Sequence, residues 1–324
     1  MDTSLIKARS RLYRNIRDFF DSRGYLEVET PCLSASLIPE PTIKNFSTLY
    51  QSEYLGSREM YLVPSPEVFI KRLIARGCGN VYEICKCFRN AEQIGSLHNP
   101  EFSMLEYYTM DFDENDSIAL TQELLRETAL PGCPDGLKQP FEVISMAQAL
   151  NKAAGLELEA IQSPKVIRQK AHELGVLDDP SVSEGWDDTF NRIFLNFVEP
   201  SLRTDVPVVL TGYPAQIECL AQNDGIVKRR WELYFGGVEI ANCYLEETSP
   251  ERVRESMRRE FARMASERAL TGEVIPDNDP EYWRIFRSFP RCSGVALGLD
   301  RLLMLQTGRQ RIDDLILFGF SDIL

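Results

Sequence analysis

The dipeptide Gly236-Gly237 stands between two apolar runs, and it constrains the fold more than any other feature of the chain. Residues 231–235 precede it and residues 238–246 follow it, and both runs have strand character. Two successive glycines supply the positive-φ positions of a tight turn, so the runs are predicted to form a β-hairpin. Neighbouring strands in a hairpin are antiparallel. The chain is therefore expected to fold around an antiparallel sheet.

The remaining pattern places helices between further strands. Apolar positions at helical spacing predict a long helix over residues 5–20, and Ser249-Pro250-Glu251 predicts the start of another helix. Residues 112–204 change to short helical patterns separated by turns, which we interpret as a helical insertion. Further strands are expected at residues 25–30, 81–89, 101–108, 206–211 and 294–298. The fold class is α+β, with residues 1–324 as a single catalytic domain.

Composition restricts the function classes. The chain has 324 residues and 44% apolar residues, enough for a large core without disulfides. Its 36 basic and 49 acidic residues give a net charge of −13, which disfavours non-specific nucleic-acid binding. The sequence has no apolar run of membrane-spanning length and no signal peptide, so a cytoplasmic protein is expected. The eight cysteines lack zinc-site spacing and are interpreted as reduced core thiols.

Polar side chains lie on one face of the strand predicted at residues 101–108. A period of two brings Phe102, Met104, Glu106 and Tyr108 to the same face. Such a row can serve a ligand, or it can be core packing with two polar tips that reach solvent. The preceding loop contains Arg89 and His98, which favours a ligand site.

The hairpin carries two further acids. We expect Tyr234 to lie opposite Glu239 and Glu232 opposite Ala241, which puts the two glutamates on one face. Neighbouring carboxylates repel unless a cation lies between them, and oxygen ligands suit Mg²⁺ bound with phosphates. Exposed carboxylates at the strand ends are the alternative.

Three more polar residues follow Glu239 on the same strand at odd separations, so regular alternation would put them on the opposite face: Asn242, Tyr244 and Glu246. Aiming them into the same site as Glu239 requires a bulge near Ala241, which the pattern alone does not reveal.

The strand at residues 294–298 runs into a helix whose first turn contains Arg301. Gly298 allows a ligand to approach the backbone, and an arginine fork suits phosphate. Together with Arg89, the two acids and an aromatic platform, these residues describe an ATP site.

These segments resemble the three motifs of class II aminoacyl-tRNA synthetases, in particular the lysyl branch. Motif 1 resembles the helix and strand ending at Pro31, motif 2 resembles residues 88–102, and motif 3 resembles residues 294–301. Motif 1 begins within the first dozen residues, which leaves no room for an N-terminal anticodon-binding domain. The arrangement is similar to the elongation factor P–(R)-β-lysine ligase family. The fold that this resemblance implies is an antiparallel sheet flanked by helices, in a homodimer formed through motif 1.

The resemblance also implies roles for individual residues. Arg89 and Arg301 are the catalytic residues, and ATP is bound by Arg89, His98, Phe102, Glu239 and Arg301. Glu232 and Glu239 hold Mg²⁺. Lysine or (R)-β-lysine is bound by Glu67, Glu106, Tyr108, Asn242, Tyr244, Glu246 and Ala296.

Some positions depart from the family pattern. Ala91 takes the position of the usual Glu of motif 2, Glu92 follows it, and the loop to His98 is one residue longer. Ala296 stands where the synthetases usually have Gly, as in the ligase family. Residues 37–41 match the family poorly, so their contacts are unassigned.

The sequence therefore predicts an AMP-forming ligase that activates (R)-β-lysine or lysine with ATP and transfers it to a lysine of elongation factor P. Two alternatives remain open. One is a truncated lysyl-tRNA synthetase-like enzyme that charges tRNA, although the acidic charge makes tRNA an unlikely partner. The other is a regulatory paralogue without catalytic activity.

Overall fold

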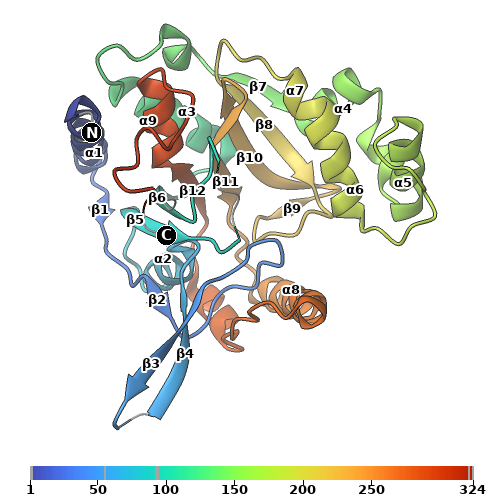
Figure 1. The fold of residues 1–324 in the computed structure, drawn as a ribbon, viewed down its shortest axis with the longest axis horizontal. Coiled ribbons are helices and arrows are strands. Elements are labelled where there is room, and N and C mark those ends of the chain that lie inside the picture. Colours follow the sequence, from blue (N-terminus) through green and yellow to red (C-terminus); the bar gives the residue numbers. More distant parts are fainter. Residues whose placement is uncertain (1–2, 55, 92–94, 320–321, 323–324) are drawn as a thin grey trace.

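A mostly antiparallel sheet of nine strands forms the centre of the molecule (Figure 1). The computed structural model describes residues 3–54, 56–91, 95–319 and 322. The strand order is β1-β5-β6-β12-β11-β10-β8-β7, with β9 beside β10. Only the pairs β1–β5 and β7–β8 are parallel. The strands of the sheet are β1 (Leu26–Glu27), β5 (Val81–Phe88), β6 (Glu101–Met110), β7 (Glu142–Ser145), β8 (Val208–Pro214), β9 (Asn223–Asp224), β10 (Val227–Phe235), β11 (Val238–Leu245) and β12 (Cys292–Gly298).

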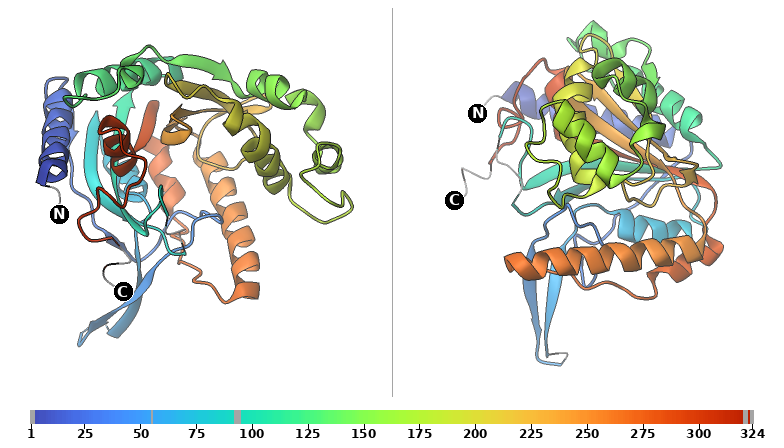
Figure 2. Two further views of the ribbon diagram at one scale, coloured as in Figure 1. Left: turned by 45° about the horizontal axis from the view of Figure 1, so that its top comes forward. Right: turned by 90° about the vertical axis from the view of Figure 1, so that its right-hand side faces the viewer.

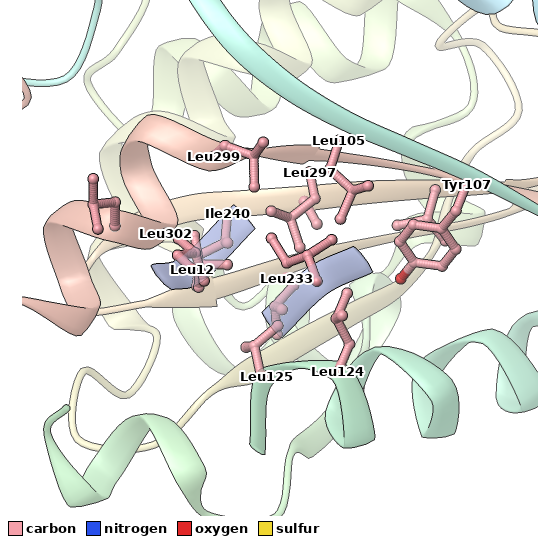
Figure 3. Packing of buried hydrophobic residues seen from close by; sticks show 14 of the residues in the cluster. Leu12, Leu105, Tyr107, Leu124, Leu125, Leu233, Ile240, Leu297, Leu299 and Leu302 are labelled. Atoms are coloured by element: carbon pink, nitrogen blue, oxygen red, sulfur yellow. The ribbon is translucent and has the colours of Figure 1, made fainter. Parts of the chain in front are cut away.

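Helices cover one face of this sheet. The helices α1 (Thr3–Asp21), α3 (Glu114–Glu127) and α9 (Leu299–Gln306) share a core cluster with β6, β10, β11 and β12. Figure 3 shows Leu12, Leu124 and Leu302 of these helices meeting side chains of the strands. Because this face is occupied by apolar packing, the opposite face is left for polar residues.

The helices α4 to α7 gather at the β7–β8 end of the sheet (Figure 1). They form their own apolar cluster around Trp186 and Phe190, whose rings stack at 5.1 Å. The helical character expected over residues 112–204 is confirmed, but α3 packs with the main core and β7 is an unexpected strand. This part contains α4 (Met146–Ala154), α5 (Pro164–Glu173), α6 (Trp186–Ile193), α7 (Glu199–Ser201), the 3₁₀ turns Asp135–Lys138 and Leu158–Ile161, and a π-helical turn, Phe194–Val198.

A small three-stranded sheet projects from the body, as both figures of the ribbon show (Figures 1 and 2). It consists of β2 (Leu33–Ser34), β4 (Gly56–Leu62) and β3 (Ser47–Ser52). Nearby, α2 (Glu67–Ile74), α8 (Pro250–Thr271) and the 3₁₀ helix Tyr282–Ser288 share a third apolar cluster. Helix α8 begins as expected, with the Ser249 hydroxyl accepting a hydrogen bond from the backbone of Arg252.

The hairpin β10–β11 corrects the predicted register. Tyr234 pairs with Glu239 as expected, but Glu232 pairs with Asn242 and not with Ala241. The cause is a β-bulge: Ile240 and Ala241 are consecutive, yet both pack in the core cluster. The extra residue returns Asn242, Tyr244 and Glu246 to the face that carries Glu239. The bulge that the site needs is therefore present at Ile240, next to Ala241 as expected.

The interpretation of the cysteines as core thiols holds for four of them. All eight are free; Cys87, Cys133, Cys243 and Cys292 are buried, whereas Cys32 and Cys78 are exposed. Across the described ranges, no helix is both long enough and apolar enough to cross a bilayer.

Candidate active site

The five residues predicted to bind ATP lie around one hollow of about 230 Å³. Arg89 follows β5, His98 comes from the β5–β6 loop, Phe102 lies on β6, Glu239 on β11 and Arg301 on α9. The face of β6 that carries Phe102 and Met104 therefore meets the bulged part of β11 and the start of α9. Segments remote in sequence thus converge as motifs 2 and 3 predict.

The two arginines of this hollow have different environments. The guanidinium of Arg89 lies 5.1 Å from the centre of the Phe102 ring, and its Nε is buried without a hydrogen-bond partner. Arg301 donates to the carbonyl of Glu239 at 2.9 Å, and its Nη2 lies 2.8 Å from Nε2 of His98. An orphaned buried donor is rare in a folded protein, so Arg89 fits an anionic ligand that would accept this hydrogen bond.

A second hollow of about 450 Å³ adjoins the first. Arg89, Glu239 and Asn242 line both hollows, so they form the boundary between the two. Glu67 and Tyr244, which were predicted to bind the amino acid, line the second hollow. This arrangement can hold two substrates whose reacting groups meet beside Arg89.

The remaining substrate residues form a buried acidic cluster behind Glu67. Glu106 and Glu246 are 3% and 1% exposed. Glu106 accepts hydrogen bonds from the hydroxyls of Ser65 and, at 3.3 Å, of Tyr108. Glu246 lies 2.7 Å from the ammonium of Lys71, which also pairs with Glu67. A lysine of the protein itself therefore occupies the acidic cluster.

Sequence reasoning missed Lys71. It lies four residues after Glu67 on α2, which is the spacing of a helical ion pair, and that signal could have found it. Its side chain is fully buried. Burial lowers the pKa of Lys71, but Glu246 and Glu67 more than compensate and raise it well above its ordinary value.

Burial dominates the electrostatics of the acids. It raises the pKa of Glu106 to about 8, with a further contribution from Glu67, and that of Glu246 to about 7. The pKa of Glu239 is raised to about 7 by burial and by the charge of Glu232. Acids of this kind are stabilised when a cation arrives, which suits an ammonium or a metal ion as ligand.

Glu232 is already engaged by its neighbours. Its carboxylate pairs with Arg230 and accepts hydrogen bonds from the hydroxyls of Tyr213, at 2.5 Å, and Tyr234, at 2.6 Å. No group of three or more metal-binding side chains occurs among the residues that the structure describes. Glu239, 3.6 Å from Arg301, remains a fitting ligand for Mg²⁺. The donor set thus fits an ion held mainly by phosphates and not a resident metal.

Small residues of β12 form the floor between the acids. Ala296 pairs with Glu106 on one side and with Asn242 on the other. Gly294 lies between Tyr108 and Tyr244, and a Cβ there would lie 2.4 Å from the Tyr108 ring and 2.6 Å from Glu246. Larger residues would therefore displace the side chains predicted to bind substrate.

The altered part of motif 2 is described only in part. Ala91 has a positive φ of 52°, an uncommon conformation for a residue with a Cβ. Glu92 lies outside the described residues.

An antiparallel sheet with two arginines and an aromatic ring at one hollow, and acids beside it, defines a class II synthetase-type catalytic domain. The sequence comparison agrees: a family described as class II tRNA synthetases (D, K and N) matches residues 2–322. Two curated relatives are named elongation factor P–(R)-β-lysine ligase. The one from Salmonella arizonae is 35% identical over 316 residues, covering 96% of this chain and 93% of the relative. The one from Salmonella paratyphi B is 34% identical over 315 residues, with the same coverage. The chain belongs to the elongation factor P–(R)-β-lysine ligase family, a branch of the class II synthetases.

Proposed function

We propose that this protein activates (R)-β-lysine, or lysine, with ATP and transfers it to a lysine side chain of elongation factor P. The observation that supports this most directly is the pair of hollows joined at Arg89, one lined by Phe102 and two arginines and the other by Glu67. The names of the relatives agree with this substrate and this acceptor. An acceptor that is a translation factor would put the reaction in the cytoplasm.

The reaction has two steps. A carboxylate oxygen of the amino acid attacks the α-phosphorus of ATP, the bond to the bridging oxygen breaks, and pyrophosphate leaves. The acceptor amine then attacks the acyl carbon, AMP leaves with the former carboxylate oxygen, and the amine loses a proton as the amide forms. Neither step requires a nucleophile from the enzyme, so catalysis is positioning and charge stabilisation.

Each predicted residue has a task in the first step. Arg89 holds the α-phosphate and the substrate carboxylate, Phe102 stacks on the adenine, and Arg301 with His98 holds the phosphate tail. Glu106, Tyr108 and Glu246 receive the distal ammonium. Glu67 and Asn242 bind the amine and carboxylate end, and Tyr244 forms a wall. Mg²⁺, held by Glu239 and, if its present partners yield, by Glu232, would neutralise phosphate charge.

We also propose the larger organisation expected from the sequence. Residues 1–324 form one catalytic domain with a helical insertion at about 112–204, and two copies form a homodimer. The class II family to which the chain belongs supports the first part.

The decisive experiment is amino-acid-dependent exchange of pyrophosphate into ATP. The wild type should exchange pyrophosphate in the presence of (R)-β-lysine. Arg301→Ala should lower the exchange rate roughly 10²-fold or more, because removing one preorganised donor to a charged oxygen typically lowers the rate by that factor. Arg311→Ala is the matched control, since Arg311 is exposed and, among the residues that the structure describes, pairs with nearby Asp313. Normal exchange by a folded Arg301→Ala would mean that ATP binds elsewhere.

Two further assays separate the alternatives. Incubation with elongation factor P and labelled amino acid should give a labelled protein, whereas tRNA should remain uncharged. Efficient, salt-sensitive charging of tRNA would replace the protein-ligase proposal with the synthetase-like alternative. A complete lack of exchange with every lysine isomer would favour the regulatory paralogue.

A further inference from the structure

The loop over residues 37–45 carries one more acid into the amino-acid hollow. The half-buried side chain of Glu40 lines this hollow together with Glu67, Arg89 and Tyr244. Within the described chain, the Glu40 carboxylate has no hydrogen-bond or ion-pair partner. It is thus an acid that faces the substrate space without a cation of its own.

The backbone of this loop is held in place by Arg268, near the end of α8. Arg268 is 2% exposed, and its guanidinium donates to a set of oxygens on both sides of it. These are the carbonyls of Val274 at 2.8 Å, Glu40 at 3.2 Å, Pro41 at 3.4 Å and Ile43, and Oδ1 of Asn45 at 3.0 Å. The two terminal nitrogens of this guanidinium bind several loop oxygens at once and so fix the path of the loop.

Both ends of the loop are also anchored. The backbone N–H of Leu37 donates to the carbonyl of Asp277 at 2.9 Å, and that of Asn90 donates to the carbonyl of Lys44 at 2.8 Å. The loop therefore bridges the segment after α8 and the motif 2 loop. These hydrogen bonds fix the loop backbone and therefore hold Glu40 at the hollow.

The charges around Glu40 are arranged for an incoming cation. Burial raises the pKa of Glu40 to about 7, with a further increase from the charge of Glu67, while Arg89, Lys71 and Arg230 act in the opposite direction. Glu67 already has Lys71 as its partner. A second cation in this space would thus meet Glu40 as the carboxylate still to be neutralised.

We propose that Glu40 binds the internal ammonium of the diamino-acid substrate, and that Arg268 is the residue that positions it. This inference rests on the proposed function. With the substrate carboxylate at Arg89 and the distal ammonium among Glu106, Tyr108 and Glu246, the internal ammonium lies between Arg89 and Glu67. Glu40 reaches the position of the internal ammonium from the loop over residues 37–45. In the β-isomer the internal ammonium is one carbon farther from the carboxylate, so two acids bracket its position.

The test compares two ligands that differ at the internal amine. (R)-β-lysine carries it, whereas 6-aminohexanoate has the same carboxylate and distal ammonium without it. Glu40→Gln should raise the Kd of (R)-β-lysine roughly 10- to 100-fold in calorimetric titrations and leave that of 6-aminohexanoate within about twofold, because only the first ligand loses a charged partner. Glu218→Gln is the control, since Glu218 lines the same hollow but pairs with Arg259 at 2.6 Å.

Arg268→Lys tests the positioning role. It should raise KM for (R)-β-lysine in pyrophosphate exchange with little change in kcat, and should not alter inhibition by 6-aminohexanoate. An equal effect of Arg268→Lys on both ligands would mean that Arg268 only stabilises the fold.

The outcomes separate the two proposals. If the wild type exchanges pyrophosphate but Glu40→Gln binds (R)-β-lysine normally, or weakens both ligands equally, the role of Glu40 is overturned alone. The role is also overturned if the defect is confined to transfer from preformed adenylate, which would make Glu40 a base for the acceptor amine. If Glu40→Gln selectively weakens (R)-β-lysine in a protein that shows no exchange, the proposed function fails and the binding role stands.

Discussion

At the scale of single residues, the amino-acid site is a balance between buried acids and the cations that neutralise them. Among the residues that the structure describes, the hydrogen-bond partners of Glu106 are two neutral donors, the hydroxyls of Ser65 and Tyr108. Its raised pKa means that in the free protein at neutral pH the carboxyl group is mostly protonated. The ammonium of a substrate would displace that proton.

This balance predicts a pH-dependent stability. The pKa of Glu106 is about 8 in the folded chain against an ordinary 4.5, so the folded state binds the proton more tightly, and the free energy of unfolding falls as pH rises between these values. The steepest loss from one group is about 1.4 kcal/mol per pH unit. Glu106→Gln should flatten this fall, measured by urea unfolding at several pH values.

The matched control is Glu59→Gln, at an exposed position of β4. It should reproduce the wild-type profile. An unchanged profile for Glu106→Gln would contradict the assignment of a raised pKa to this group.

Ala296 is the residue expected to decide between lysine isomers. Its neighbours on the adjacent strands are Glu106 and Asn242, and it lines the first hollow together with Arg89, so we expect its methyl group to lie beside the carboxylate end of the substrate and the carbons next to it. A misfit of one methyl is typically about 1–3 kcal/mol, or roughly 10- to 200-fold in specificity. We expect the wild type to prefer (R)-β-lysine over L-lysine, and Ala296→Gly to narrow or reverse the preference.

The measurement is the ratio of kcat/KM for the two isomers in the two proteins. An equal ratio in both would leave Ala296 with a packing role only, and a wild-type preference for L-lysine would also defeat the prediction.

At the scale of elements, the small residues Gly294 and Ala296 of β12 leave room for the side chains of the neighbouring strands. Gly294→Ala should push the Tyr108 ring and Glu246 out of position, because the new methyl group would meet both well inside contact distance. Overpacking of this kind typically destabilises by about 1–3 kcal/mol. We expect a matching loss of thermal stability and weaker binding of (R)-β-lysine by calorimetry. Ser293→Ala, next to it on the strand, removes a buried hydroxyl without a partner and should change neither.

The hairpin β10–β11 shows what sequence patterns can and cannot predict. The Gly236-Gly237 turn, the antiparallel pairing and the opposition of Tyr234 and Glu239 follow from local rules and are confirmed. The pairing of Glu232 with Ala241 was wrong, because a bulge at Ile240 arises from core packing that strand periodicity does not encode. The partners of Glu232 were also missed: Arg230 and Tyr234 lie two residues away on the same strand, and Tyr213 comes from the neighbouring strand β8.

At the scale of the whole molecule, one flank carries apolar side chains that the monomer leaves exposed. Leu26 of β1 and Leu33 of β2 are 54% and 43% exposed. The strands β1 and β2 follow α1 along the left edge of the molecule in Figure 1. A nearby hollow of about 640 Å³ includes Tyr13 and Leu315. We expect a homodimer through this flank, with a light-scattering mass of twice 37.0 kDa at micromolar concentration.

The substitution Leu26→Glu should shift the dimer toward monomer, because it buries a charge in the expected interface. The same change at Leu270, an 87% exposed residue of α8, should leave the mass unaltered. A wild-type monomer would contradict the prediction directly.

The resident ammonium of Lys71 would make the proposed amino-acid site select by valence as well as by shape. With Glu40, Glu67, Glu106 and Glu246 all ionised, Lys71 would leave three negative charges uncompensated. A diamino acid brings two ammonium groups, which can replace two of the protons held by these acids, while its carboxylate pairs with Arg89. A monoamino acid of similar size, such as norleucine, has only one cation to exchange and would strand one more charge or retain one more proton. The site would then behave like an ion exchanger with a divalent preference, and rejection of ordinary amino acids would follow without any steric barrier.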